Sequence, residues 1–162
     1  MADQNVVILG GSGNVGREFL SQVIQHDTVF SNKHLNPTNI IALANSKGFW
    51  FNKQGLEIQK NPERVHKWKS SKEAFNKHMQ GLDQFREYDN LAELLKLIED
   101  EGMSGEIVFV DVTSGKDDLR DFHLKVINDS DESIVTANKN PLSIYPTDVF
   151  IALTRPRERY GF

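Results

Sequence analysis

The chain has 162 residues, of which 38% are hydrophobic, and a mean hydropathy of -0.47, which suits one soluble domain with a packed core. Its 19 lysines and arginines against 23 aspartates and glutamates give a formal charge of -4, which argues against nucleic acid and anionic membranes as partners. The lack of cysteine excludes disulfides and thiolate chemistry, and no apolar run approaches the roughly 20 residues of a membrane helix. Because the N-terminus also lacks a signal-peptide pattern, we expect a cytoplasmic protein.

A glycine-rich turn stands near the start of the chain, between a predicted strand at Val6 to Leu9 and a predicted helix at Arg17 to His26. Gly11, Gly13 and Gly16 form a G-x-G-x-x-G pattern in the strand–turn–helix context that gives it meaning. The first glycine allows a sharp turn, the second lets a pyrophosphate approach the backbone, and the third lets helix and strand pack closely. The N–H groups and the dipole at the helix start favour a bound phosphate. The turn therefore predicts a dinucleotide site, and the alternative is a turn that binds nothing.

The second predicted strand, Asn39 to Ala44, ends at the position that selects the cofactor. An acidic residue there would hydrogen-bond the ribose 2′-hydroxyl of NAD. This chain has Asn45, Ser46 and Lys47 instead, so no carboxylate repels a 2′-phosphate and a lysine is available to pair with one. We therefore expect NADP in preference to NAD, unless Lys47 is only a solvated loop residue.

Aromatic and basic residues follow in the middle of the chain. Phe49 to Phe51 predict a short strand whose rings belong to the core, before a turn at 52–55. The stretch 61–81 is basic and helix-prone, with Trp68 among its lysines. Basic residues around an aromatic can indicate nucleic acid, but the interleaved glutamates and the negative total charge favour a solvated helix face.

Strands and helices alternate through the rest of the chain. Their spacing predicts helices at Asp89–Asp100, Asp117–Asn128 and Asp148–Leu153, and strands at Ile107–Val110 and Ile134–Val135. Asp89 and Thr147 are expected to cap the first and last of these helices, and Gly102 to end the first. The alternation predicts an α/β fold, a Rossmann-like doubly wound parallel sheet in a single domain.

Polar clusters follow three of the predicted strands, at 11–16, 111–115 and 136–140. In an open parallel sheet, ligands bind beyond the carboxyl ends of the strands, so we expect these clusters to converge on one crevice. Thr113 and Ser114 offer hydroxyls to a ribose, a phosphate or a nicotinamide amide, and both can also cap the next helix.

These segments resemble the nucleotide-binding half of homoserine dehydrogenase. The resemblance is carried by Gly11 to Gly16, by Asp111 to Ser114 and most specifically by Thr136 to Leu142, while Ile41 to Lys47 is similar to the family's second strand and the basic residue after it. The four motifs occur in the family's order. The resemblance implies hydride transfer between NAD(P) and a small amino-acid substrate, interconverting L-homoserine and L-aspartate 4-semialdehyde in threonine and methionine biosynthesis.

The resemblance also implies roles for individual residues. The pyrophosphate would be held by Gly11, Ser12, Gly13, Asn14, Val15 and Gly16. The adenosine ribose and its phosphate would lie at Asn45, Ser46 and Lys47, and the nicotinamide side at Thr113 and Ser114. Asn138 and Lys139 would lie at the active-site crevice, with Lys139 in an electrostatic role. We predict no catalytic residue in this chain, and its five histidines lack the spacing of metal ligands.

The chain differs from the family in its length. It ends at Phe162, where the family continues into a hinge and a second domain with the substrate pocket, the catalytic residues and most of a homodimer interface. We expect residues 1–146 to form the cofactor domain, and residues 147–162 to form a helix and a loop leading to a strand that has been cut off. We further expect the isolated chain to bind NADP weakly and to turn over little or nothing.

Two other functions fit parts of the sequence. The glycine-rich turn is also similar to that of atypical short-chain dehydrogenase relatives, some of which sense NADP without catalysis. Such a sensor suits the short length but does not account for Thr136 to Leu142, and none of Tyr88, Tyr145 and Tyr160 has a lysine four residues on. The third interpretation is a nucleotide-binding module that serves oligomerisation.

Overall fold

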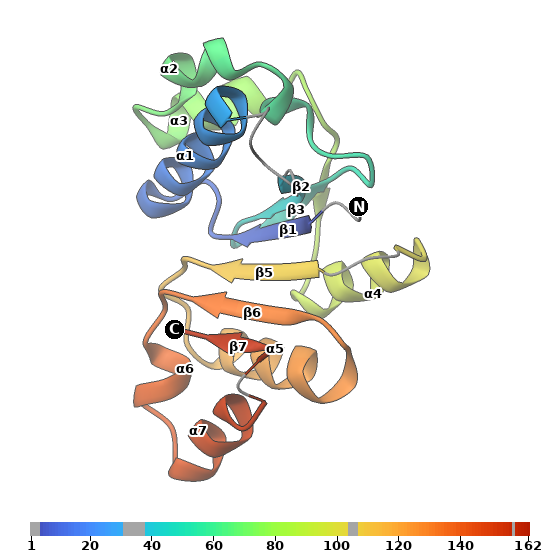
Figure 1. Ribbon diagram of the computed structural model, residues 1–162, viewed down its shortest axis with the longest axis vertical. Helices are drawn as coiled ribbons and strands as arrows, with labels where there is room; N and C mark the ends of the chain where they lie inside the picture. The colour runs from blue at the N-terminus through green and yellow to red at the C-terminus, as the bar shows by residue number, and fades with distance from the viewer. Residues whose placement is uncertain (1–3, 31–37, 104–106, 157) are drawn as a thin grey trace.

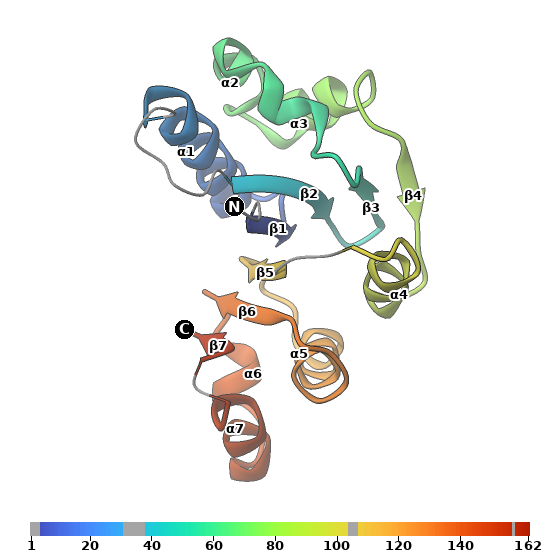
Figure 2. The ribbon, with the colours of Figure 1, turned by 45° about the vertical axis from the view of Figure 1, so that its right-hand side comes forward.

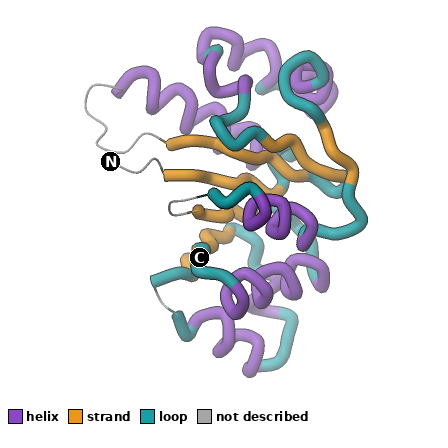
Figure 3. The backbone as a smooth tube through the Cα atoms, turned by 90° about the vertical axis from the view of Figure 1, so that its right-hand side faces the viewer, coloured by secondary structure: helices purple, strands orange, loops and turns teal. Residues whose placement is uncertain are grey.

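The computed structural model describes residues 4–30, 38–103, 107–156 and 158–162, which form a seven-stranded sheet with helices on both faces (Figures 1 and 3). The strands are β1 (Gln4–Leu9), β2 (Thr38–Ala44), β3 (Gly48–Phe51), β4 (Phe85–Glu87), β5 (Ile107–Asp111), β6 (Ser133–Thr136) and β7 (Tyr160–Gly161). The helices are α1 (Asn14–Phe30), α2 (Val65–Trp68), α3 (Lys72–Met79), α4 (Ala92–Asp100), α5 (Asp117–Asp129), α6 (Asn140–Ser143) and α7 (Thr147–Thr154). Two 3₁₀ turns, η1 (Glu57–Lys60) and η2 (Pro62–Arg64), precede α2.

The strand order is β4-β3-β2-β1-β5-β6-β7, and β2, β1, β5, β6 and β7 run parallel. The last residues of four neighbouring strands pair in one row, formed by Ala44, Leu9, Asp111 and Thr136. The loops that follow these residues therefore leave the same edge of the sheet, as the arrows of β1, β5 and β6 show in Figure 1. The predicted Rossmann-like fold is confirmed.

One edge of the sheet departs from the parallel pattern. Strand β3 pairs antiparallel with β2, and β4 pairs antiparallel with β3. The connection between Ala44 and Gly48 is too short for the crossover that a parallel neighbour needs, so the chain reverses in a hairpin. A Cβ on Gly48 would lie 2.1 Å from the carbonyl oxygen of Arg86, so β4 approaches β3 as closely as a glycine permits.

Apolar side chains fill both faces of the sheet. Val6 and Ile8 of β1 lie in a core with α1, α2 and α3, whereas Val7 and Leu9 lie in a core with α4, α5 and α7. Figure 2 shows these two sets of helices on opposite sides of the sheet. Burial on both faces explains why the central strands are continuous apolar runs. No helix within the described segments has the length and apolar character to span a membrane.

Several predicted elements are confirmed with shifted ends. Helix α1 begins at Asn14 rather than Arg17 and runs to Phe30, so it includes part of the predicted connection at 27–36, whose end lies outside the described residues. The rings of Phe49 and Trp50 are buried, as expected of core. Trp68, in the basic helix-prone stretch, is fully buried, so its ring belongs to the core and not to the solvated face of that stretch.

Both predicted helix caps were wrong. Helix α4 begins at Ala92 because Asn90 Oδ1 accepts the Ala92 N–H at 2.9 Å and Glu93 Oε1 accepts the Asp89 N–H at 2.9 Å. These two side chains satisfy amides near the helix start, and the side chain of Asp89 does not cap it. Helix α7 starts at Thr147 after Pro146, and no side chain caps it. The short strand β4 and the one-turn helix α6 were not predicted.

Candidate functional site

Backbone hydrogen bonds hold the glycine-rich turn against the end of β2. The amides of Gly10 and Gly11 both donate to the Ala44 carbonyl, at 2.9 and 3.1 Å, and the amide of Gly13 donates to the Gly10 carbonyl at 3.0 Å. Gly10, rather than the predicted Gly11, makes the sharp turn, because its φ is +87°, a region that favours glycine. A Cβ on Gly11 would lie 3.0 Å from Cδ2 of Leu43, so Gly11 serves close packing against β2.

The other two glycines have different surroundings. A Cβ on Gly16 would lie 2.2 Å from the Gly10 carbonyl oxygen, so the first turn of α1 packs directly on the glycine-rich turn. Gly13 is exposed, and a Cβ there would meet only the Gly10 carbonyl oxygen within 4 Å, at 3.2 Å. Because α1 begins at Asn14, the N–H groups of its first turn have no intrahelical partners. Gly13 is thus the glycine where a ligand has room to approach these donors.

Arg17 lies buried under the turn and was not predicted as a site residue. Its guanidinium donates to the Ser12 carbonyl at 2.6 Å, to Asn14 Oδ1 at 2.8 Å and to the Lys69 carbonyl at 3.1 Å. The residue is 5% exposed, and it takes part in none of the ion pairs between described residues. A positive charge that no carboxylate balances therefore lies directly beneath the glycine-rich turn.

The loops after β5 and β6 are joined by side-chain hydrogen bonds. Nδ2 of Asn138 donates to Thr113 Oγ1 at 3.2 Å and to the Gly115 carbonyl at 2.9 Å. Nδ2 of Asn140 donates to the carbonyls of Ser114 and Gly115, at 3.1 and 3.0 Å. Asn140 was not predicted as a site residue, although it lies within the 136–140 cluster. The two loops are held as one unit, and neither Thr113 nor Ser114 caps α5.

The glycine-rich turn touches this unit. A Cβ on Gly10 would lie 3.0 Å from Cγ2 of Thr113 and 3.2 Å from the carbonyl oxygen of Val112. The three loops predicted to converge therefore meet at one rim of the sheet. Ser114 and Lys139 are exposed there, whereas Ser12 and Asn138 are buried.

The loop at 45–47 lies at the β2 end of this rim, between two cavities. Its shape is fixed by Asn45, whose Oδ1 accepts the amides of Lys47 at 2.8 Å and Gly48 at 3.2 Å, and whose carbonyl accepts the Tyr88 hydroxyl. Ser46 lines a cavity of about 370 Å³ with residues of α4 and α5. Asn45 and Lys47 line a cavity of about 510 Å³ on the side of α3 and β4. Burial and the negative charge of Asp118 raise the pKa of Tyr88, so its hydroxyl stays protonated as a donor.

A buried carboxylate supports the rim from below. Asp111 is fully buried, and its Oδ1 accepts the Thr113 N–H at 2.9 Å. Burial alone would raise the pKa of Asp111, but hydrogen bonds from His123 and from Thr113, together with the charge of His123, outweigh it and lower the pKa. Asp111 therefore stays ionised and fixes the start of the loop after β5.

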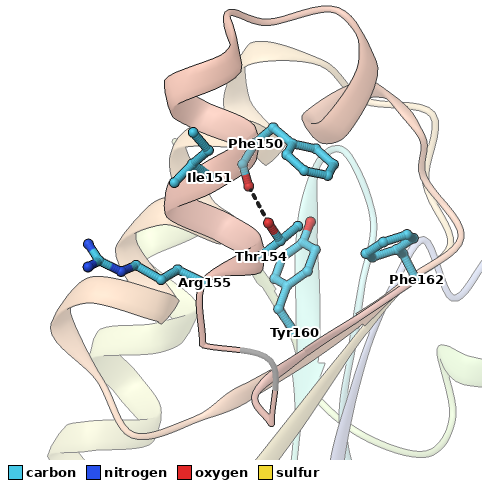
Figure 4. Close-up of a pocket in the computed structure, with 6 residues that line it drawn as sticks. All are labelled: Phe150, Ile151, Thr154, Arg155, Tyr160 and Phe162. Atoms are coloured by element: carbon cyan, nitrogen blue, oxygen red, sulfur yellow. Dashed lines mark hydrogen bonds between the residues drawn. The ribbon is translucent and has the colours of Figure 1, made fainter.

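A further depression, of about 1000 Å³, lies between α7 and β7 and is lined by Phe150, Ile151, Thr154, Arg155, Tyr160 and Phe162 (Figure 4). None of the predicted cofactor residues lines it. The loop predicted at 154–159 is followed within the chain by strand β7, which pairs parallel with β6.

Known proteins match this chain in structure but not in sequence family. No family model and no curated protein matches it. A homoserine dehydrogenase from Thermoplasma acidophilum matches with a TM-score of 0.66 and 15% identity, over 99% of this chain and 42% of that chain. A hyperthermophilic archaeal homoserine dehydrogenase in complex with NADPH matches with a TM-score of 0.61 and 18% identity, over 99% of this chain and 44% of that chain.

The chain has a homoserine dehydrogenase-like fold. A protein of unknown function from Candida auris also matches, with a TM-score of 0.63 and 20% identity, over 94% of this chain and 35% of that chain. The chain thus spans less than half the length of the structures it resembles. At these identities the likeness to homoserine dehydrogenases concerns the fold, and function has to be argued from the site.

Proposed function

We propose that the chain is the cofactor-binding part of an NAD(P)-dependent oxidoreductase that interconverts L-homoserine and L-aspartate 4-semialdehyde. The observation that carries this proposal is the meeting of three loops at one rim, through the contact of Gly10 with Thr113 and the bonds of Asn138 across the loops. A homoserine dehydrogenase of similar fold binds NADPH. Residues 1–146 form the proposed cofactor unit, and residues 147–162 complete the sheet beside it.

We assign the pyrophosphate to the glycine-rich turn. Gly13 leaves room for a phosphate next to the free amides of the first turn of α1, and the helix dipole favours a negative charge there. The guanidinium of Arg17 adds a positive charge beneath the same turn. Ser12, Asn14 and Val15 belong to this turn, with Asn14 and Val15 exposed at its surface.

We assign the adenosine end to the loop at 45–47. Ser46 and Lys47 are exposed, and neither carries a carboxylate that would repel a 2′-phosphate. Lys47 is the cation available to that phosphate, so NADP is the preferred cofactor and NAD the weaker one. The neighbouring cavity at Ser46, bounded by α4 and α5, offers space for the base.

We assign the nicotinamide end to the loops after β5 and β6. Thr113 and Ser114 are the polar groups of the first loop, and the exposed ammonium of Lys139 lies on the second. Asn138 is 5% exposed, and its side-chain amide donates to Thr113 and Gly115, so it shapes the site rather than contacting the cofactor. NADP bound here would supply the hydride acceptor, and the hydroxyls of Thr113 and Ser114 would orient its ring.

We assign the amino-acid substrate, the proton-transfer group and a homodimer contact to the remainder of a full-length protein of this kind. Hydride transfer needs a substrate carbon held against the nicotinamide and a group that exchanges the proton of its oxygen. Lys139, on the loop after β6, is an exposed titratable side chain of the rim. We keep it as an electrostatic residue.

Cofactor titration tests this proposal. NADPH and NADH are titrated against the 162-residue chain while the fluorescence of the reduced nicotinamide is followed. We expect saturable binding of both, tighter for NADPH, and no measurable oxidation of L-homoserine with NADP⁺. Absence of saturable binding would contradict the cofactor assignment, and substantial homoserine oxidation by the chain alone would contradict the assignment of catalysis to the rest of the protein.

A further inference from the structure

Three buried polar side chains connect the last strand of the sheet to the rim. Tyr160 of β7 lies beside Thr154 of α7, with Phe162 on its other side (Figure 4). Its hydroxyl lies 2.8 Å from Nδ1 of His123, in the middle of α5. Nε2 of His123 in turn lies 3.1 Å from Oδ2 of Asp111, at the end of β5. His123 and Asp111 are fully buried and Tyr160 is 5% exposed, so the three groups interact within the interior.

The surroundings of Tyr160, His123 and Asp111 determine how these three side chains interact. Burial and the nearby charge of Asp111 raise the pKa of Tyr160, so the phenol keeps its proton while it is hydrogen-bonded to Nδ1 of His123. Nε2 of His123 faces the Asp111 carboxylate, whose oxygens can only accept, so the proton that lies between them is on Nε2. The Nε2–H lies off the ideal line to Oδ2, but no other acceptor is available to it among the described residues. Tyr160 thus holds the imidazole in the orientation that directs Nε2 at Asp111.

Asp111 contacts both rim loops, which connects them to His123. Its Oδ1 accepts the amide of Thr113 at 2.9 Å, which starts the loop after β5. Its Oδ2 lies 3.3 Å from Oγ1 of Thr136, which accepts the amide of Asn138 at 2.9 Å in the loop after β6. The polar groups therefore form a continuous path from β7 through α5 to the two loops that carry the proposed nicotinamide end.

Burying three ionisable groups is costly, and apolar residues of similar size would fill the same space at lower cost. The path ends at two loops rather than within the core, so its effect is to fix loop conformation. We propose that His123 is a positioning residue for the cofactor site. Held by Tyr160, it fixes Asp111, and through Asp111 it sets the loops at Thr113 and Asn138. This role rests on the proposed function, because it assumes that these loops receive the cofactor.

The test compares variants that differ at single polar atoms. Tyr160→Phe removes only the hydroxyl, and Tyr145→Phe is its matched control, since that hydroxyl bonds Asp117 on the surface. His123→Gln keeps a donor near the Nε2 position, whereas His123→Leu removes it. Two quantities are measured for each variant: the Kd for NADPH, and the hydrogen-exchange rates of the Thr113 and Asn138 amides by NMR.

We expect Tyr160→Phe and His123→Leu to weaken NADPH binding by about five- to tenfold, which corresponds to the loss of one ordinary hydrogen bond. The same two variants should speed exchange of the Thr113 and Asn138 amides. His123→Gln should retain most of the affinity, and Tyr145→Phe should match the wild type in both measurements. Rescue by glutamine distinguishes positioning from general loss of packing, because glutamine fills the space less well than histidine.

The outcomes separate the two proposals. Unchanged exchange at Thr113 and Asn138 in both variants would overturn the positioning role of His123. Faster exchange with unchanged NADPH affinity would also overturn it, because the path would then serve stability alone. If the wild type binds no dinucleotide, the proposed function fails, and the positioning role for a cofactor fails with it whatever the exchange rates show.

Discussion

Nδ2 of Asn138 donates to Oγ1 of Thr113 across two loops that lie 25 residues apart in the sequence. The same amide nitrogen donates to the Gly115 carbonyl, so one buried side chain joins both loops at the rim. Backbone geometry alone would leave the loops after β5 and β6 free to move separately. Their union makes the rim a single surface.

Removal of this amide is expected to loosen the rim. Asn138→Ala should lower the free energy of unfolding by about 1–3 kcal/mol, because the half-buried Thr113 hydroxyl loses this donor and the Gly115 carbonyl keeps only the one from Asn140. Asn138→Asp should destabilise at least as much, since it places a carboxylate oxygen against the Gly115 carbonyl. Urea unfolding of the two variants beside the wild type measures both effects. A variant with aspartate that is more stable than the alanine variant would contradict the donor role.

The packing of α1 on the glycine-rich turn gives a second prediction. Gly16→Ala should destabilise the protein by about 1–3 kcal/mol or more, because the new methyl group would lie 2.2 Å from the Gly10 carbonyl oxygen. Helix propensity alone predicts the opposite sign, a gain of about 1 kcal/mol for alanine over glycine. Thermal and urea unfolding decide between these two signs. A stabilised variant would show that the glycine-rich turn can shift to accommodate the methyl group.

Gly13 should separate binding from folding. Gly13→Ala adds a methyl group in an exposed position whose one close neighbour, the Gly10 carbonyl oxygen, lies 3.2 Å away, so stability should change little. NADPH affinity should fall about tenfold, because the methyl occupies the space through which the pyrophosphate approaches the backbone. Gly81→Ala is the matched control, since a Cβ there would meet nothing within 4 Å. Equal NADPH affinity of the two variants would contradict the assignment of the pyrophosphate to the space beside Gly13.

Charge reversal at Lys47 tests the preference between the two cofactors. Lys47→Glu should lower the ratio of NADPH to NADH affinity by about three- to tenfold, a modest factor because the side chain is exposed and solvent-screened. Lys53→Glu makes the same charge change at a lysine that bonds the Glu101 carbonyl. An affinity ratio that is the same in both variants would show that Lys47 does not meet the 2′-phosphate.

The buried carboxylate of Asp111 is expected to make the free energy of unfolding sensitive to acid. The pKa of Asp111 is lower in the folded than in the unfolded chain, so folding gains stability from its ionised form. That stability is fully present above the unfolded pKa of about 3.9 and is lost as the pH falls through the lower folded pKa. Asp111→Asn should therefore differ most from the wild type near neutral pH, and the difference should shrink below about pH 4. Urea unfolding between pH 3 and pH 7 measures it, with Asp89→Asn as the exposed control, and a constant difference would contradict the shift.

The sheet could be predicted from the sequence because each strand is marked by a pattern within a few consecutive residues. Apolar runs such as Ile107 to Val110 report burial on both faces, and the three polar clusters follow strand ends that parallel pairing brings into one row. The convergence of the loops at one rim could therefore be inferred before the structure. Helix ends were less predictable, since several side chains can satisfy the amides near a helix start: Asn90 accepts from Ala92, and Glu93 accepts from Asp89.

The missed parts of the site depend on contacts between distant residues. Arg17 bonds the carbonyl of Lys69, 52 residues away, and His123 meets Tyr160 across 37 residues. No periodicity or motif in the sequence marks such pairs. Arg17 could have drawn attention by its position directly after Gly16, where a charged residue enters a helix face that packs on the sheet.

The bonds of Arg17 bear on how fast and how tightly the turn captures a ligand. Because the guanidinium already ties Ser12 and Asn14 to the Lys69 carbonyl, the turn acquires its shape when the protein folds. For a dinucleotide bound as proposed, this turn is a preorganised receptor, and the entropic penalty of ordering a loop does not subtract from the affinity. Substitutions around Trp68 and Lys69, remote along the chain, are therefore expected to alter the residence time of a ligand on this turn.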